Sequence, residues 1–179
     1  MIGIWIVGCE IAFWILVLAG LSVRYLAGWK KGGAVLLLMT PVVDLLLIIL
    51  TIMDLRGGAE AEFMHGLVAV YIGVTIAFGH RMIHWADERF AYRFGGGAKP
   101  QKAPKYGKAH ARRERQGWFR HALAWVIGSI LIFLMIVVVN DPERTEALKQ
   151  VPLLWAWIVG IDFVISFSYT LWPRKKKGY

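Results

Sequence analysis

Three acidic residues lie inside long apolar stretches of this 179-residue sequence, where an ionised carboxylate is costly. Glu10, Asp44 and Asp162 each lie near the middle depth of a stretch that is long enough to cross a bilayer as a helix. An acid at the centre of such a helix costs roughly 2.5–3.5 kcal/mol on insertion scales. No lysine or arginine lies at that depth. We therefore expect the three acids to share protons, hold a cation or contact water.

Polar side chains repeat at helical spacing around two of these acids. Thr40 precedes Asp44 by four residues, and Ser166 and Tyr169 follow Asp162 by four and seven residues. Such spacings place side chains on one face of a helix. We expect these faces to point toward the other helices of the protein rather than toward lipid.

A proline just before Asp44 adds to the chemistry expected there. Pro41 has no N–H, so one helix carbonyl near the acid loses its usual partner and is left for a small cation or a chain of waters. Together these residues predict a site that binds or moves a proton, a small cation or a cationic solute. The alternative is that protonated acids hydrogen-bond from helix to helix and only stabilise the bundle.

Three histidines and an aspartate form a second candidate group. His80, His84 and Asp87 follow one another at spacings of four and three, and His121 opens a later apolar stretch. Their helix faces also hold small residues that would allow close approach of two helices, namely Gly73, Ala77, Ala124 and Gly128. This set fits a divalent metal such as zinc, or a b-type haem held by two imidazoles. The alternative is ordinary packing near helix ends; His65, at the opposite end, is expected to face water.

Five apolar stretches of about 20 residues would carry these groups. The chain is 58% hydrophobic, and the stretches lie at residues 2–22, 34–53, 65–85, 118–139 and 152–172. No window alternates polar and apolar residues over a sustained length, so helices rather than strands are expected. The sequence predicts an all-α integral membrane bundle of five transmembrane helices, which forms a single domain over residues 1–179.

Basic residues are distributed unevenly among the segments outside these stretches. Segments 24–33, 86–117 and 173–179 hold three, nine and four lysines and arginines, whereas 54–64 and 140–151 hold one and two. Rich and poor segments alternate along the chain, and basic segments stay on the cytoplasmic side of a membrane. The N-terminus is therefore expected outside and the C-terminus in the cytoplasm, with the protein in the plasma (inner) membrane.

The composition of segment 86–117 predicts a flexible basic loop in the cytoplasm. Glycine, proline and lysine are frequent in 95–108, whereas 109–121 can be helical again. We expect the basic residues of the loop to contact anionic lipid headgroups. These residues are Lys99, Lys102, Lys105, Lys108, Arg112, Arg113 and Arg115. Because orientation accounts for much of the net charge of +9, a nucleic-acid partner is not expected.

No motif of a common enzyme class is present: the sequence has no Gly-rich phosphate loop, nucleophile elbow or HExxH. A non-enzymatic membrane protein with a midplane acidic site is therefore the leading expectation. A second expectation is a structural or regulatory membrane subunit whose basic face docks anionic lipid, a protein partner or a second copy of the chain. A third is an electron carrier with b-type haem, which the histidines would hold.

Overall fold

Helices account for most of the chain in its computed structural model. The structure describes residues 2–94, 96–101 and 103–174, and at residues 2, 3, 6, 10, 30, 38, 41, 44 and 64 it describes the backbone alone. The helices are α1 (Ile2–Tyr25), α2 (Lys30–Leu38), α3 (Thr40–Arg56), α4 (Phe63–Phe94), α5 (Gly107–Val139) and α6 (Glu146–Leu171). No strand occurs in the described residues, so the prediction of an all-α protein is confirmed.

Four of the helices are long and apolar enough to cross a membrane, as judged by length and composition. The qualifying segments are Val7–Tyr25 in α1, His65–Phe94 in α4, Gly107–Val139 in α5 and Glu146–Leu171 in α6. They correspond to four of the five predicted stretches. Both ends of the predicted flexible loop are helical as well, because α4 extends to Phe94 and α5 begins at Gly107. Residues 95–106 connect these two helices.

The remaining predicted stretch, residues 34–53, is not one continuous helix. It is divided between α2, which has 9 residues, and α3, which has 17, with the break at Met39. Pro41 explains the break, because it cannot donate to the carbonyl of Leu37 four residues earlier. The Thr40 hydroxyl donates to that carbonyl oxygen over 2.9 Å instead. The carbonyl that the sequence suggested for a cation therefore already has a donor.

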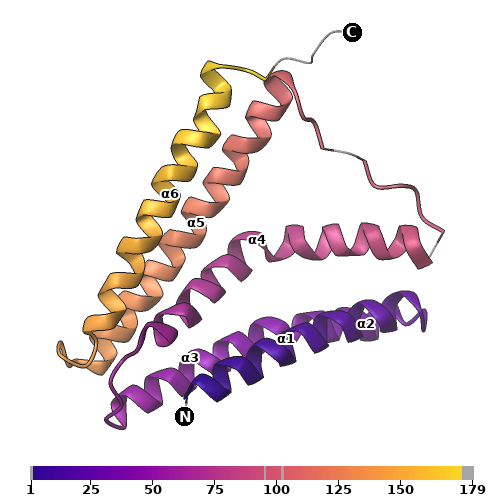
Figure 1. Cartoon of the computed structure of the whole chain (residues 1–179). Coiled ribbons are helices and arrows are strands. Elements are labelled where there is room, and N and C mark those ends of the chain that lie inside the picture. The colour runs from indigo at the N-terminus through magenta and orange to yellow at the C-terminus, as the bar shows by residue number, and fades with distance from the viewer. Residues whose placement is uncertain (1, 95, 102, 175–179) are drawn as a thin grey trace.

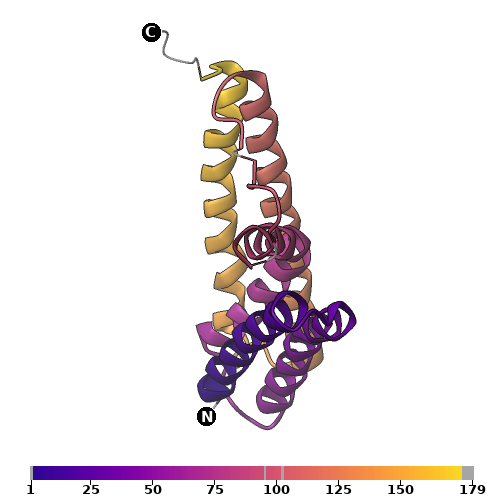
Figure 2. The same ribbon diagram turned by 90° about the vertical axis from the view of Figure 1, so that its right-hand side faces the viewer.

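The helices form two groups that are joined by α4 (Figures 1 and 2). α5 and α6 run antiparallel side by side, and α1 packs against α2 and α3 in the other group. α4 contacts both groups: its first half packs on α5 and α6, and after a bend its second half lies along α1 (Figure 1). Within the described residues, α6 contacts α4 and α5 but neither α1 nor α3.

Small residues allow α4 and α5 to approach closely, as their positions in the sequence predicted. A Cβ atom added to Gly73 would collide with the carbonyl oxygen of Ala124. One added to Gly128 would lie 3.1 Å from the carbonyl oxygen of Ala69 and 2.6 Å from the ring of Trp155. Backbone therefore packs directly on backbone at this crossing, which is a common way for membrane helices to associate.

Contacts between the connecting segments agree with the alternation of charge. In the two segments that are poor in basic residues, the Ala61 N–H donates to the carbonyl oxygen of Arg144 over 2.8 Å. Among the basic segments, Arg24 pairs with Asp87 at 3.3 Å, and the Gly107 N–H donates to the carbonyl oxygen of Arg174 over 2.9 Å. Segments of like character thus contact each other, as they would on the two sides of a membrane.

Candidate functional site

A chain of hydrogen bonds links α5 and α6 through four side chains. The Trp155 indole N–H donates to Nε2 of His121 over 3.2 Å, and Nδ1 of His121 lies 3.0 Å from Oδ2 of Asp162. The Ser166 hydroxyl donates to Oδ1 of Asp162 over 3.1 Å. Trp155, Asp162 and Ser166 follow one another on α6 at spacings of seven and four, so they share one helix face. The structure thus joins His121 and Asp162, which the sequence assigned to two different sites.

The order of donors in this chain determines where the hydrogen lies on His121. An indole N–H can only donate, so Nε2 of His121 must be the accepting nitrogen. In the neutral ring the hydrogen is then on Nδ1, which donates it to Asp162. The carboxyl group of Asp162 consequently accepts at both oxygens, one from His121 and one from Ser166.

Two tryptophans of α5 hold α6 in the register that this chain requires. Trp118 donates to the carbonyl oxygen of Val159 over 3.0 Å, and Trp125 donates to that of Pro152 over 2.9 Å. Around them, Ala124, Trp155 and Val159 form a buried cluster on which apolar side chains of α4 pack, namely Val74, Ala77 and Phe78. The indole bonds lie on both sides of Trp155 along α6, so α6 cannot slide along α5 without breaking them.

The pair of His121 and Asp162 lies well inside both helices. His121 is eighteen residues from the end of α5 at Val139, and Asp162 is sixteen residues from the start of α6 at Glu146. At 1.5 Å per residue these separations are ~27 and ~24 Å, within a bilayer core of ~30 Å. Both side chains are half-buried, at 26% and 34% exposed.

A relative of known sequence extends over nearly the whole chain. The chain is 49% identical over 174 residues to a protein of Bacillus subtilis (strain 168) named uncharacterized membrane protein YmcC. The alignment covers 97% of this chain and 93% of that protein. The chain belongs to the YmcC family. No family model and no solved structure matches it. Together with the four helices that could cross a membrane, the relationship shows a multi-pass membrane protein.

The helix packing separates Asp162 from the other two acids of the predicted midplane set. The side chains of Glu10 and Asp44 lie outside the described residues. The backbone at these positions belongs to α1 and α3, neither of which contacts α6 in the described part of the chain. Thr40, one turn before Asp44, is 4% exposed, and its hydroxyl is bonded to the carbonyl oxygen of Leu37 in α2. In this structure, the partners of Asp162 are His121 and Ser166.

The residues of the predicted metal or haem site are dispersed. His80 is exposed, His84 lies 3.7 Å from Glu88, and Asp87 pairs with Arg24 on α1. The Nε2 lone pair of His121 accepts from Trp155, so it does not face open space. Among the described residues, no group of three or more His, Cys, Asp or Glu side chains is arranged to hold a metal ion.

Two histidines that the sequence did not assign to a site are buried. His65, which was expected to face water, is 2% exposed, and its Nδ1 accepts from the backbone N–H of Glu62 over 2.9 Å. The three-residue spacing is that of a capping interaction at the start of α4, a sequence signal that could have revealed it. His110 is 8% exposed, and its ring centroid lies 4.8 Å from that of Tyr169. Tyr169 thus completes the α6 face that packs on α5.

The basic residues predicted to contact lipid lie mostly on the surface of the connection and the first turns of α5. Lys99, Lys105, Lys108 and Arg112 are exposed, whereas Arg113 and Arg115 are half-buried. Arg115 donates to the hydroxyl of Thr170 over 2.7 Å, which joins the basic end of α5 to the end of α6. Lys102 lies outside the described residues.

Proposed function

We propose that this YmcC-family protein is a non-enzymatic plasma membrane protein that binds and moves a proton at Asp162, with His121 as the partner of the carboxylate. The observation that supports the proposal is the donor order from Trp155 through His121 to Asp162. It gives a neutral imidazole whose Nδ1–H points to the carboxyl group of Asp162. This carboxyl group lies in the membrane-crossing part of α5 and α6, where an acid is costly unless neutralised, and a bound proton neutralises it.

A proton fits this site better than a metal cation. Both carboxylate oxygens of Asp162 already accept hydrogen bonds, from His121 and from Ser166. A cation would have to displace one of these donors, and the described residues around it offer no further cluster of acidic ligands. A proton needs only the lone pair of one oxygen, and a hydroxyl such as that of Ser166 can turn to accept from the protonated acid.

A proton on Asp162 leaves His121 neutral, so the bond from Trp155 to Nε2 is kept. A proton that passes through His121 would make Nε2 a donor that faces the indole N–H of Trp155, which is also a donor. The two N–H groups repel each other, so Trp155 would have to move during that step.

We further propose that the chain crosses the membrane five times, with its N-terminus outside and its C-terminus in the cytoplasm. The fifth crossing would be α2 and α3 together, a helix broken at Met39. α3 alone has 17 residues, which gives ~26 Å, slightly short of a bilayer core. The alternation of basic segments supports this orientation.

The experiment that tests the proton site compares wild type with Asp162→Asn in liposomes under an imposed pH gradient, with a pH-sensitive dye inside. We expect wild type to carry protons above the leak of empty liposomes and Asp162→Asn to return to that leak. Asp141→Asn is the matched control, because Asp141 forms its ion pair with Arg144 outside the α5–α6 interface. It should keep full flux.

Infrared difference spectra between neutral and acidic pH test the binding step separately from flux. Wild type should gain a protonated-carboxyl band that Asp162→Asn lacks and Asp141→Asn keeps. If Asp162→Asn keeps both the flux and this band, Asp162 is not the proton site. If the band is present without any flux, the site binds a proton but does not move it across the membrane, and the transport part of the proposal fails.

A second role, docking of anionic lipid headgroups, is favoured by the exposure of Lys99, Lys105, Lys108 and Arg112. At the start of α5, the Gly107 N–H donates to the carbonyl oxygen of Arg174, a further basic residue that follows α6. Each basic residue near an anionic surface contributes about 1 kcal/mol of attraction. This role is compatible with the proton site, because the two involve different residues.

A further inference from the structure

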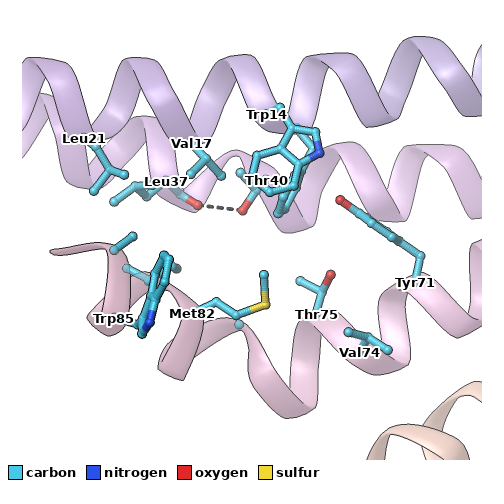
Figure 3. A pocket seen from close by; sticks show the side chains of 14 residues that line it. Trp14, Val17, Leu21, Leu37, Thr40, Tyr71, Val74, Thr75, Met82 and Trp85 are labelled. Atoms are coloured by element: carbon cyan, nitrogen blue, oxygen red, sulfur yellow. Dashed lines mark hydrogen bonds between the residues drawn. The ribbon is translucent and has the colours of Figure 1, made fainter. Parts of the chain in front are cut away.

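A cavity of about 460 Å³ lies between the α1–α3 group and α4 (Figure 3). Its volume is within the range of roughly 300–1,000 Å³ that is typical of ligand sites. Trp14 and Leu21 line it from α1, Leu37 from α2, and Met82 and Trp85 from α4. None of the residues of the α5–α6 proton site lines it. The cavity is therefore a separate feature of the fold.

The cavity follows α4 and is apolar. Along α4 its lining residues extend from Tyr71 to Ala86, and along α1 from Phe13 to Leu21, which are ~22 and ~12 Å of helix. No charged side chain lines it, and the Thr40 hydroxyl on its wall is bonded to Leu37. An alkyl chain that lies along α4 matches this lining.

Positive charge lies at the end of the cavity near Trp85 and Ala86. The guanidinium of Arg89 lies 3.8 Å from the centroid of the Trp85 ring, which lines this end. The acids in this region are already engaged: Arg24 holds Asp87, and His84 lies against Glu88. Arg89 would attract an anionic headgroup to this end of the cavity.

We infer that the cavity holds an acyl chain of an anionic phospholipid, with its headgroup at the basic end beside Arg89. The apolar slot accommodates the chain, and the charge at its end selects the headgroup. Neither feature alone would specify the occupant, since any lipid has acyl chains and any basic surface attracts anions. Their arrangement end to end is what an anionic phospholipid matches.

Gly79 offers a variant that fills the cavity without disturbing the helix. It lines the cavity, and an added Cβ would meet only Cγ2 of Thr75, at an ordinary contact distance of 3.7 Å. Gly79→Leu should therefore place its side chain where the acyl chain lies. Gly160→Leu is the matched control, because Gly160 is exposed on α6 and a Cβ there meets nothing within 4 Å.

The probe is phosphatidylglycerol with a photoactivatable group in its acyl chain, used in phosphatidylcholine nanodiscs that contain the full chain. Peptide mass spectrometry maps the crosslinks. We expect crosslinks to Met82 and to the segment around Trp14, which fall about tenfold or more in Gly79→Leu because leucine occupies the volume of several methylenes. Gly160→Leu should be labelled like wild type.

Two further comparisons test the role of the headgroup charge and whether the acyl chain belongs to a phospholipid or to a free fatty acid. Phosphatidylcholine with the same photoactivatable chain should label Met82 more weakly, and Arg89→Gln should remove much of this preference for phosphatidylglycerol. Equal labelling of wild type and Gly79→Leu, or equal labelling by the two phospholipids, would overturn the inference. So would photoactivatable palmitic acid that labels the cavity in the presence of excess phosphatidylglycerol, because it would assign the site to a free fatty acid.

Discussion

The hydrogen bond from Thr40 to Leu37 gives a sharp prediction about the helix break. Pro41 leaves the Leu37 carbonyl without its backbone donor, and the Thr40 hydroxyl replaces that donor at 2.9 Å. Thr40→Val keeps the branched shape of the side chain and removes only the hydroxyl. Thr40 and Leu37 are 4% and 7% exposed, so water cannot easily take its place. We expect Thr40→Val to destabilise the protein.

Two general figures bracket the expected loss. A buried acceptor without a donor costs ~1–3 kcal/mol, and side-chain hydrogen bonds measured in a membrane protein contribute ~0.6 kcal/mol on average and ~1.7 kcal/mol at most. The expected loss of free energy of unfolding is therefore about 1 kcal/mol, which changes the ratio of folded to unfolded protein about fivefold. Thr40→Ser keeps the hydroxyl and should lose much less.

Pro41→Ala turns this prediction into a double-mutant cycle. Alanine at position 41 restores a backbone N–H four residues after Leu37, so the hydroxyl of Thr40 becomes dispensable. In the Pro41→Ala background, Thr40→Val should cost only a few tenths of a kcal/mol, and the coupling energy should be about 1 kcal/mol. Reversible unfolding in mixed detergent micelles, followed by circular dichroism, measures all four proteins. An equal effect of Thr40→Val in both backgrounds would refute the explanation of the break.

Two other predictions concern packing and topology. Gly73→Ala should destabilise the protein by ~1–3 kcal/mol in the same unfolding assay, because its methyl group would meet the backbone of Ala124. Gly160→Ala, where the added methyl has open space, should not destabilise it. Equal effects of the two substitutions would show that α4 and α5 do not pack backbone on backbone at Gly73. In a cysteine-free background, a cysteine at exposed position Glu60 should react with an impermeant thiol reagent in intact cells while one at exposed Lys105 should not; the reverse pattern would invert the proposed orientation.

Much of the fold could be predicted because a membrane imposes simple rules on sequence. Long apolar stretches predicted four of the helices that could cross, since only such stretches satisfy their backbone within lipid. Gly73 and Gly128 predicted the close crossing of α4 and α5 for a similar reason, because backbones can approach only where side chains are small. Pro41 predicted the lost helix hydrogen bond before Asp44, but not the division of the stretch into α2 and α3, because the apolar composition continues through it.

The candidate site shows where prediction from sequence stopped. The spacing of Trp155, Asp162, Ser166 and Tyr169 placed them on one face of α6, and the structure turns that face to α5. The spacing within α6 could not identify His121 of α5 as the partner of Asp162. The predicted depth of Asp162 suggested two other acids as its neighbours, whereas the partner in the structure is His121.

The sequence by itself determined the class of the protein, the helical segments and the segments that lie together at each side, because these follow from local composition and charge. Only the tertiary structure decided which faces meet. The hydrogen bonds of His121 to Trp155 and Asp162 join residues 34 and 41 positions apart, and the cavity combines three helices with the bend of α4. Such relations depend on the rotation and crossing of each helix against its neighbours, which periodicity within a single helix does not specify.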